Sequence, residues 1–271
     1  MATTSSGLFH FIENMPAWQL ATSCSLFFVA LTWIGIVFIK PFLQFGLRNE
    51  PDSNTLVAQA SSGFSLFYGL LLGLLSVAAY QNTQNVMQYV ASEASTLGVM
   101  YRGLGAYPEP LRSELQYLVR DYTQYVIREE FPAHREGRTP DGGSLRMQTL
   151  ATRLIEFEPA TKTQEILHGQ ILDQFNNLID ARQHRLNGVY SGIPGVMWYV
   201  VGIGAVINLI LIWMLRMRFW THLFLGGLVS FFLGVMIFLI IVMDRPLRGE
   251  ASIGPDTYQR TYDLVMRWDE T

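Results

Sequence analysis

Long apolar runs alternate with polar helical stretches along the chain, and four of the runs reach membrane-spanning length. About 20 apolar residues in a helix cross the hydrocarbon core of a bilayer. The pattern therefore predicts spanning helices over residues 17–39, 61–80, 193–215 and 219–243. Lys40 and Pro41 are expected to end the first helix, and residues 43–60 to form a polar connection to the second.

Residues 81–192 are polar and show helical rather than strand-like spacing. Apolar positions on one face predict a continuation of the second spanning helix, followed by helices over 109–130, 144–157 and from Thr161 or Thr163 to about Arg185. Pro132 is expected to stop the first of these, and the tail predicts a short helix over 256–268. The predicted fold is an all-α membrane protein with a helical extramembrane domain inserted between its second and third spanning helices.

The predicted organisation has five parts. They are an N-terminal segment (1–16), spanning helices one and two (17–80), a helical soluble domain (81–192), spanning helices three and four (193–243) and a C-terminal tail (244–271). An even number of crossings places both termini and the soluble domain on the same side of the membrane. The basic residues that flank the spans are balanced between the two sides, so the positive-inside rule does not set the orientation.

The second spanning helix has two different faces when each residue is advanced by about 100° around the axis. One face, here named the small face, consists of Ser62, Ser65, Leu66, Gly69, Gly73, Ser76 and Tyr80. The opposite face is bulky and consists of Phe64, Phe67, Leu71, Leu75 and Ala78. The small face fits two interpretations: a helix-packing seam, since Gly69 and Gly73 form a GxxxG pair, or the wall of a pore.

Two polar residues, one in the third spanning helix and one beyond the second, also allow two interpretations each. Asn208 lies within the third span and favours an interhelical hydrogen bond over an ion ligand. Glu93 lies on the polar continuation of the second helix. It is either a solvated or ion-paired residue, or part of a charged ring below a pore, which only a symmetric oligomer could form.

The composition excludes several classes of function. Charged residues make up 15% of the chain, against roughly 25% in an ordinary soluble domain. The net charge of −3 and the absence of a basic stripe argue against nucleic-acid binding. Cys24 is the one cysteine, and the five histidines are scattered, so neither an intramolecular disulfide nor a metal site is expected. No nucleotide-binding or nucleophile motif is present, so neither enzymatic activity nor a cofactor is expected.

Five stretches carry a resemblance that covers the chain from about Ser61 to Gly249. They are LFYGLLLGLLSVAAYQ, ASEASTLGVMYR, RDYTQYVIREEFP, DARQHRLNGVYSGIPGVMWYV and MDRPLRG. They resemble the bestrophin-like family of bacterial membrane proteins. The chain is more distantly similar to true bestrophins. Those are pentameric anion channels with four spanning helices, a cytosolic helical domain and a neck lined by the second helix.

This resemblance implies specific roles for residues of the second helix. If Ser65 and Gly69 match the Ser and Gly of the bestrophin helix, then Ser62, Leu66 and Leu70 occupy the constriction, and Leu70 joins the small face as a pore-lining residue. The bulky aromatic neck of bestrophins is replaced here by smaller side chains. The acidic run that binds calcium in animal bestrophins has no counterpart, so calcium activation is not expected.

The resemblance and the small face together favour a homo-oligomeric ion channel in the lipid bilayer. By analogy it is a pentamer that conducts an anion such as chloride, in the inner membrane of a bacterium, with its termini and central domain in the cytoplasm. The alternative is a non-conducting membrane scaffold or sensor whose helical domain binds a partner. A transporter is less favoured, because the sequence shows no inverted repeat or broken helix.

Overall fold

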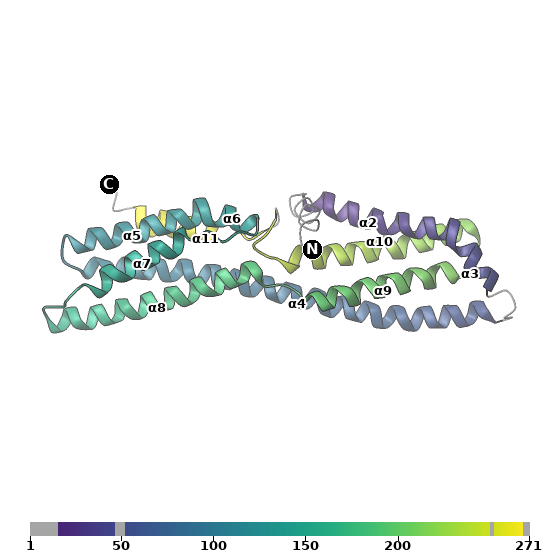
Figure 1. Ribbon diagram of the computed structural model, residues 1–271, viewed down its shortest axis with the longest axis horizontal. Helices are drawn as coiled ribbons and strands as arrows, with labels where there is room; N and C mark the ends of the chain where they lie inside the picture. The colour runs from purple at the N-terminus through teal and green to yellow at the C-terminus, as the bar shows by residue number, and fades with distance from the viewer. Residues whose placement is uncertain (1–15, 47–51, 250–251, 268–271) are drawn as a thin grey trace. The chain divides into compact units, whose positions relative to one another are not determined.

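The chain is helical in every secondary-structure element that the computed structural model describes, which comprises residues 16–46, 52–249 and 252–267 (Figure 1). Within these ranges, four helices are long and apolar enough to cross a membrane. The predicted all-α class with four spans is therefore confirmed. The predicted N-terminal segment lies almost entirely outside the described residues. The chain forms two compact units, one of the described residues up to Asn82 with Gly192–Asp244, the other of Thr83–Ser191 with those from Arg245 on.

The first unit contains the apolar helices. They are α2 (Ala17–Ile34), a π-helical turn (Gly35–Ile39), α3 (Lys40–Gly46), the first part of α4 (Ser53–Gly103), α9 (Gly195–Met214) and α10 (Phe219–Asp244). α2 and α10 lie side by side (Figure 1) and approach closely at Gly234, where a Cβ atom would lie 2.5 Å from the Ser25 Cα. The Thr32 and Ser230 hydroxyls share a buried hydrogen bond of 2.5 Å between these helices. Small residues and hydroxyl pairs of this kind are what hold helices together in lipid.

The second unit contains the rest of α4 and the shorter amphipathic helices. They are α5 (Leu111–Tyr125), a π-helical turn (Val126–Glu130), α6 (Phe131–Arg135), α7 (Gly142–Ile155), α8 (Lys162–Tyr190), α11 (Asp256–Thr261) and a final π-helical turn (Tyr262–Met266). Their apolar faces meet in one core that includes Leu97, Leu115, Leu150, Leu178 and Tyr258. Thr161, one of the two predicted start residues of this helix, caps α8 by accepting a hydrogen bond from the Gln164 N–H. α7 begins at Gly142, two residues before the expected Ser144.

Two prolines do not end their helices, contrary to prediction. The helix that begins with α2 continues past Pro41 to the end of α3 at Gly46. The helix that begins with α5 continues past Pro132 to the end of α6 at Arg135. A π-helical turn ends two residues before each proline, at Ile39 and at Glu130. Such a turn shifts the hydrogen-bond register and widens the helix, so the pyrrolidine ring and its missing N–H are accommodated.

α4 begins at Ser53, eight residues before the predicted start, and runs without a break to Gly103. The predicted polar connection is too long, because residues 54–60 mix polar and apolar side chains and contain no proline or glycine to interrupt a helix. Val57 is buried and extends the packed stripe of the spanning part toward the N-terminus of the helix. α4 therefore contributes to both units.

Candidate functional site

One stripe of α4 packs into the core of the first unit. Tyr68, Leu72, Leu75 and Ala79 are buried there at helical spacing. The Tyr68 hydroxyl donates a hydrogen bond of 2.8 Å to the Val201 carbonyl of α9. Its ring lies over Gly204, where a Cβ atom would be only 2.2 Å from it. This stripe fixes the rotation of α4 about its own axis, and therefore the direction in which its other faces point.

The small face lies outside that packed stripe. Ser62, Ser65, Leu66, Gly69 and Tyr80 are exposed, whereas Gly73 and Ser76 are partly exposed. A Cβ atom built at Gly69 or Gly73 would meet nothing within 4 Å. The GxxxG pair is therefore not a packing seam inside the subunit. Either a seam between subunits or a pore wall still fits, and the pore-lining assignment stays a prediction.

The edge of the small face contacts α9 through one polar pair. The Ser65 hydroxyl donates to the Asn208 side-chain oxygen at 3.2 Å, and Asn208 is buried. The expected interhelical hydrogen bond of Asn208 is confirmed. The Ser76 hydroxyl instead donates to the Leu72 carbonyl of its own helix, at 2.8 Å. Both hydroxyls thus have an acceptor already and keep their oxygen lone pairs available.

The remaining exposed surface of spanning α4 is apolar. Phe67, Leu70, Leu74 and Val77 are all more than half exposed. Leu70, which joined the candidate residues only through the resemblance, lies at the boundary between this surface and the small face by its 100° position. Phe64, Leu71 and Leu75, which the sequence placed on the bulky face with Phe67, pack inward. The helix therefore has a packed stripe, a small face and an exposed apolar face, rather than two faces.

Glu93 is not on the surface of the subunit. Its side chain is fully buried in the second unit and pairs with Arg185 at 2.7 Å. A charged ring around an axis would need a carboxylate exposed on the subunit surface. The placement corrects the ring interpretation and agrees with the ion-paired alternative.

Glu93 belongs to a buried network of two carboxylates and two guanidinium groups. Arg185 contacts Glu93 and Glu130 at 2.7 Å each, and Arg182 contacts Glu130 at 2.9 Å. The Tyr122 hydroxyl donates to Glu93 at 2.5 Å and accepts from Arg182 at 2.8 Å. The formal charges cancel, which is the condition under which ionised groups are tolerated in a core.

The network sets the ionisation of its members. Burial opposes the charge on Glu130, but Arg185 and Arg182 outweigh it and hold the pKa of this carboxyl below its usual range. Burial likewise opposes the charge on Arg185, and Glu93, with other neighbours, keeps its pKa well above the ordinary value. Burial, reinforced by Arg185, lowers the pKa of His134 to about 3. Glu130 and Arg185 therefore remain ionised, and His134 beside them stays neutral.

The sequence contains a pattern that could have predicted this network, but it is missed when only the apolar positions are followed. Glu93 lies on the same helical face as Val90 and Leu97, which are core residues. Arg182 and Arg185 likewise continue the stripe that contains Leu178. Charged residues at core positions on different helices, in equal numbers of each sign, would have predicted a buried ion network.

The low pKa of His134 predicts a pH-dependent stability of the second unit. The folded protein keeps this imidazole neutral down to about pH 3, whereas the unfolded chain protonates it near pH 6.5. The unfolded state binds the extra proton between these values, so the free energy of unfolding falls as the pH decreases from 6.5, by up to about 1.4 kcal/mol per pH unit. Glu130 adds to the loss in the same direction below its ordinary pKa of 4.5.

The measurement is denaturant unfolding in detergent between pH 7 and pH 5, a range above the ordinary carboxylate pKa values. His134→Gln should flatten the slope. The exposed His184 gives the matched control, and His184→Gln should leave the slope unchanged. Equal slopes in wild type and His134→Gln would contradict the assignment.

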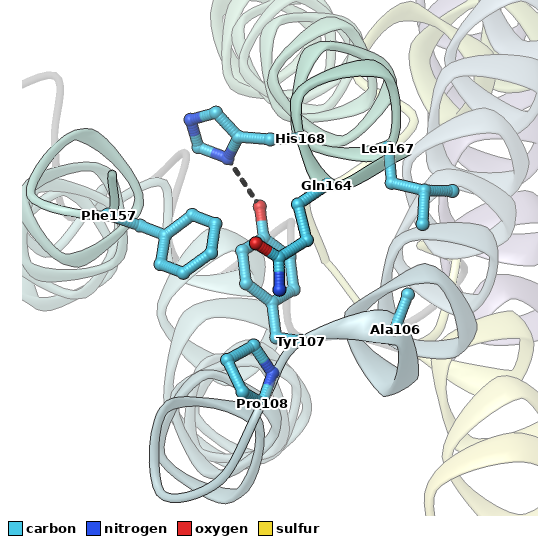
Figure 2. Close-up of a pocket in the computed structure, with 7 residues that line it drawn as sticks. All are labelled: Ala106, Tyr107, Pro108, Phe157, Gln164, Leu167 and His168. Carbon is cyan, nitrogen blue, oxygen red and sulfur yellow. Dashed lines mark hydrogen bonds between the residues drawn. The ribbon is translucent and has the colours of Figure 1, made fainter. Parts of the chain in front are cut away.

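A shallow hollow lies near the loop that joins α4 to α5. It is open to solvent and is lined by Tyr107, Phe157, Gln164 and His168, with Ala106, Pro108 and Leu167 (Figure 2). The Tyr107 hydroxyl and the His168 Nδ1 atom share a hydrogen bond of 2.6 Å (Figure 2). The lining contains no carboxylate, and no group of metal-ligating side chains exists among the described residues. Tyr107 and His168 are the titratable pair of the hollow.

The whole-chain arrangement corresponds to a known family. The model of the bestrophin-like domain matches residues 26–258. This chain belongs to the bestrophin-like family. Comparison with curated protein sequences gives no match.

Solved structures share the fold of this bestrophin-like protein at low sequence identity. A bacterial bestrophin homologue from Klebsiella pneumoniae gives a TM-score of 0.67 at 10% identity, over 89% of this chain and 98% of that chain. A variant of that homologue gives 0.66 at 11% identity, over 90% and 98%. A structure described only as a membrane protein gives 0.70 at 9% identity, over 89% and 98%. At such identities the likeness shows the fold alone.

Proposed function

We propose that this bestrophin-like protein is a homo-oligomeric ion channel whose pore is lined by the small face of α4. The observation that carries the proposal is the unfilled space beside Gly69 and Gly73, on a helix whose packed stripe is fixed in the subunit core. A run of glycine and serine that no neighbouring helix of the subunit covers leaves room for a path. Hydroxyls and backbone along such a run can solvate an ion.

A path of this kind requires several copies of the chain. In one subunit α4 lies at the surface, so its small face can enclose a space only when symmetry repeats it around an axis. The membership of the family favours five copies and an anion such as chloride as the permeant ion. Under this proposal the protein acts as a channel and not as an enzyme.

The resemblance to bestrophins also favours one orientation. The proposed location is the inner membrane of a bacterium, with the helical second unit and both termini in the cytoplasm. The lipid-facing surface is then the exposed apolar part of the first unit, which includes Phe67 and Phe232.

Current across a planar bilayer tests the proposal. Purified protein in a potassium chloride gradient should carry a current that reverses near the equilibrium potential of chloride. Absence of current from folded, oligomeric protein would overturn the channel in favour of a non-conducting scaffold. A current that reverses near the potassium potential would keep the channel and overturn anion selectivity.

A further inference from the structure

Lys40 is the first residue of α3, at the C-terminal end of the first spanning helix. Its contacts play no part in the proposed pore. Its ammonium nitrogen is 2.7 Å from the His222 Nδ1 atom of α10 and 3.5 Å from the Met217 carbonyl. α3, the 215–218 turn and the beginning of α10 meet at this end of the first unit (Figure 1). The side chain is therefore held by two elements that are distant in sequence.

The partners of Lys40 are both uncharged. His222 is buried, and its Nε2 atom lies 2.9 Å from the Ile212 carbonyl, which can only accept a hydrogen bond. The imidazole proton is thus on Nε2, so Nδ1 carries a lone pair that accepts from the ammonium. Among the residues that the structure describes, no carboxylate lies within 4.0 Å of the Lys40 nitrogen. The ammonium is therefore oriented by two uncharged acceptors.

The surroundings are those of a membrane interface. Phe42, Phe45 and Trp220 are 81%, 78% and 79% exposed. Arg218 is also exposed, on the turn that supplies the Met217 carbonyl. Aromatic rings and cations at the end of a spanning helix are typical of the headgroup level of a bilayer. Lys40 is thus a cation at the same end of the first unit as these exposed rings.

We infer that Lys40, held by His222 and the Met217 carbonyl, binds the phosphate of an anionic phospholipid. A lysine ammonium binds phosphate as a point charge, and a lysine or arginine near the membrane surface is attracted to anionic headgroups. The occupant is a lipid rather than free phosphate because the exposed rings of Phe42, Phe45 and Trp220 are apolar surface that acyl chains would cover. The site is separate from the small face of α4.

Amine acylation of the unmodified protein tests this site, since Lys40 and Lys162 are the only lysines of the sequence. Protein in nanodiscs is treated with a succinimidyl ester, and the modification of each lysine is measured by mass spectrometry. The ratio of Lys40 to Lys162 modification should be about fivefold lower in phosphatidylglycerol than in phosphatidylcholine nanodiscs, the factor expected for one cation at an anionic surface. An unchanged ratio would overturn the inference. Equal protection by inorganic phosphate in phosphatidylcholine nanodiscs would overturn the assignment to lipid.

Native mass spectrometry in detergent separates a bound lipid from the general potential of a charged surface. Wild type and Lys40→Arg should retain phosphatidylglycerol that Lys40→Met releases. Lys162→Met changes the charge by the same amount in the second unit and should retain it. Equal retention by Lys40→Met and Lys162→Met would contradict the site, and the acylation ratio decides the case if Lys40→Met does not fold.

Discussion

Tryptophan in place of Gly73 should remove the current of the reconstituted protein. The backbone there has open space beside it, so an indole fits without disturbing the subunit core. In a symmetric ring every copy would place this indole at the same level of the pore. Side-chain bulk at a constriction controls permeation, and we expect at least about a tenfold smaller current. The measurement is planar-bilayer current at equal protein reconstitution.

Phe67→Trp is the matched control for this substitution. Phe67 is exposed on the apolar face of the same helix, close to the level of Gly69. It gains an indole of the same size on the side that the proposal assigns to lipid. Its current should equal that of wild type. If Gly73→Trp conducts normally, or if Phe67→Trp blocks as strongly, the small face does not line the path.

Methionine in place of Arg185 should strongly destabilise the second unit. Arg185 is fully buried between Glu93 and Glu130, and removing it leaves both carboxylates without their shared partner. Loss of one member of a buried ion pair costs about 3–5 kcal/mol, since an uncompensated charge remains in the core. The free energy of unfolding should fall by that amount in denaturant titrations of the detergent-solubilised protein, followed by circular dichroism.

Lys162→Met is the control for Arg185→Met, because it removes a cation from an exposed ion pair instead of a buried one. Lys162 and Glu165 lie 3.0 Å apart on the surface of α8 with both side chains exposed. Exposed pairs contribute little to stability, so this variant should unfold like wild type. A similar small effect of Arg185→Met would mean that Glu93 and Glu130 find other partners or become protonated without a large loss of stability.

The sequence predicts the fold well where the lipid bilayer imposes a simple rule. Twenty apolar residues with charged or proline boundaries identify α9 and α10 within about two residues at each end. The wrong predictions concern helix ends near prolines, where a π-helical turn changes the hydrogen-bond register of the backbone. Pro41 and Pro132 are helix breakers by composition, and nothing in the residues alone reveals the π-helical turns that precede them.

The sequence predicts only part of the candidate site. Rotation by 100° per residue separates Gly69 and Gly73 from Leu75, because that periodicity is a property of any helix. Whether a face is covered depends on helices distant in sequence, so the open space beside Gly73 and the contact of Tyr68 with α9 required the three-dimensional arrangement. Glu93 shows the same limit, since its partner Arg185 is 92 residues away in the chain.

The position of α4 within the oligomer is the most direct test of the central claim. An electron cryo-microscopy reconstruction of the protein in nanodiscs gives both the number of subunits and the helix nearest the symmetry axis. The proposal predicts a closed ring, five-fold by the family analogy, in which Gly69 and Gly73 of every α4 face an open axial path. A monomer, a closed dimer, or a ring whose axis is lined by another helix with α4 turned toward lipid would contradict it.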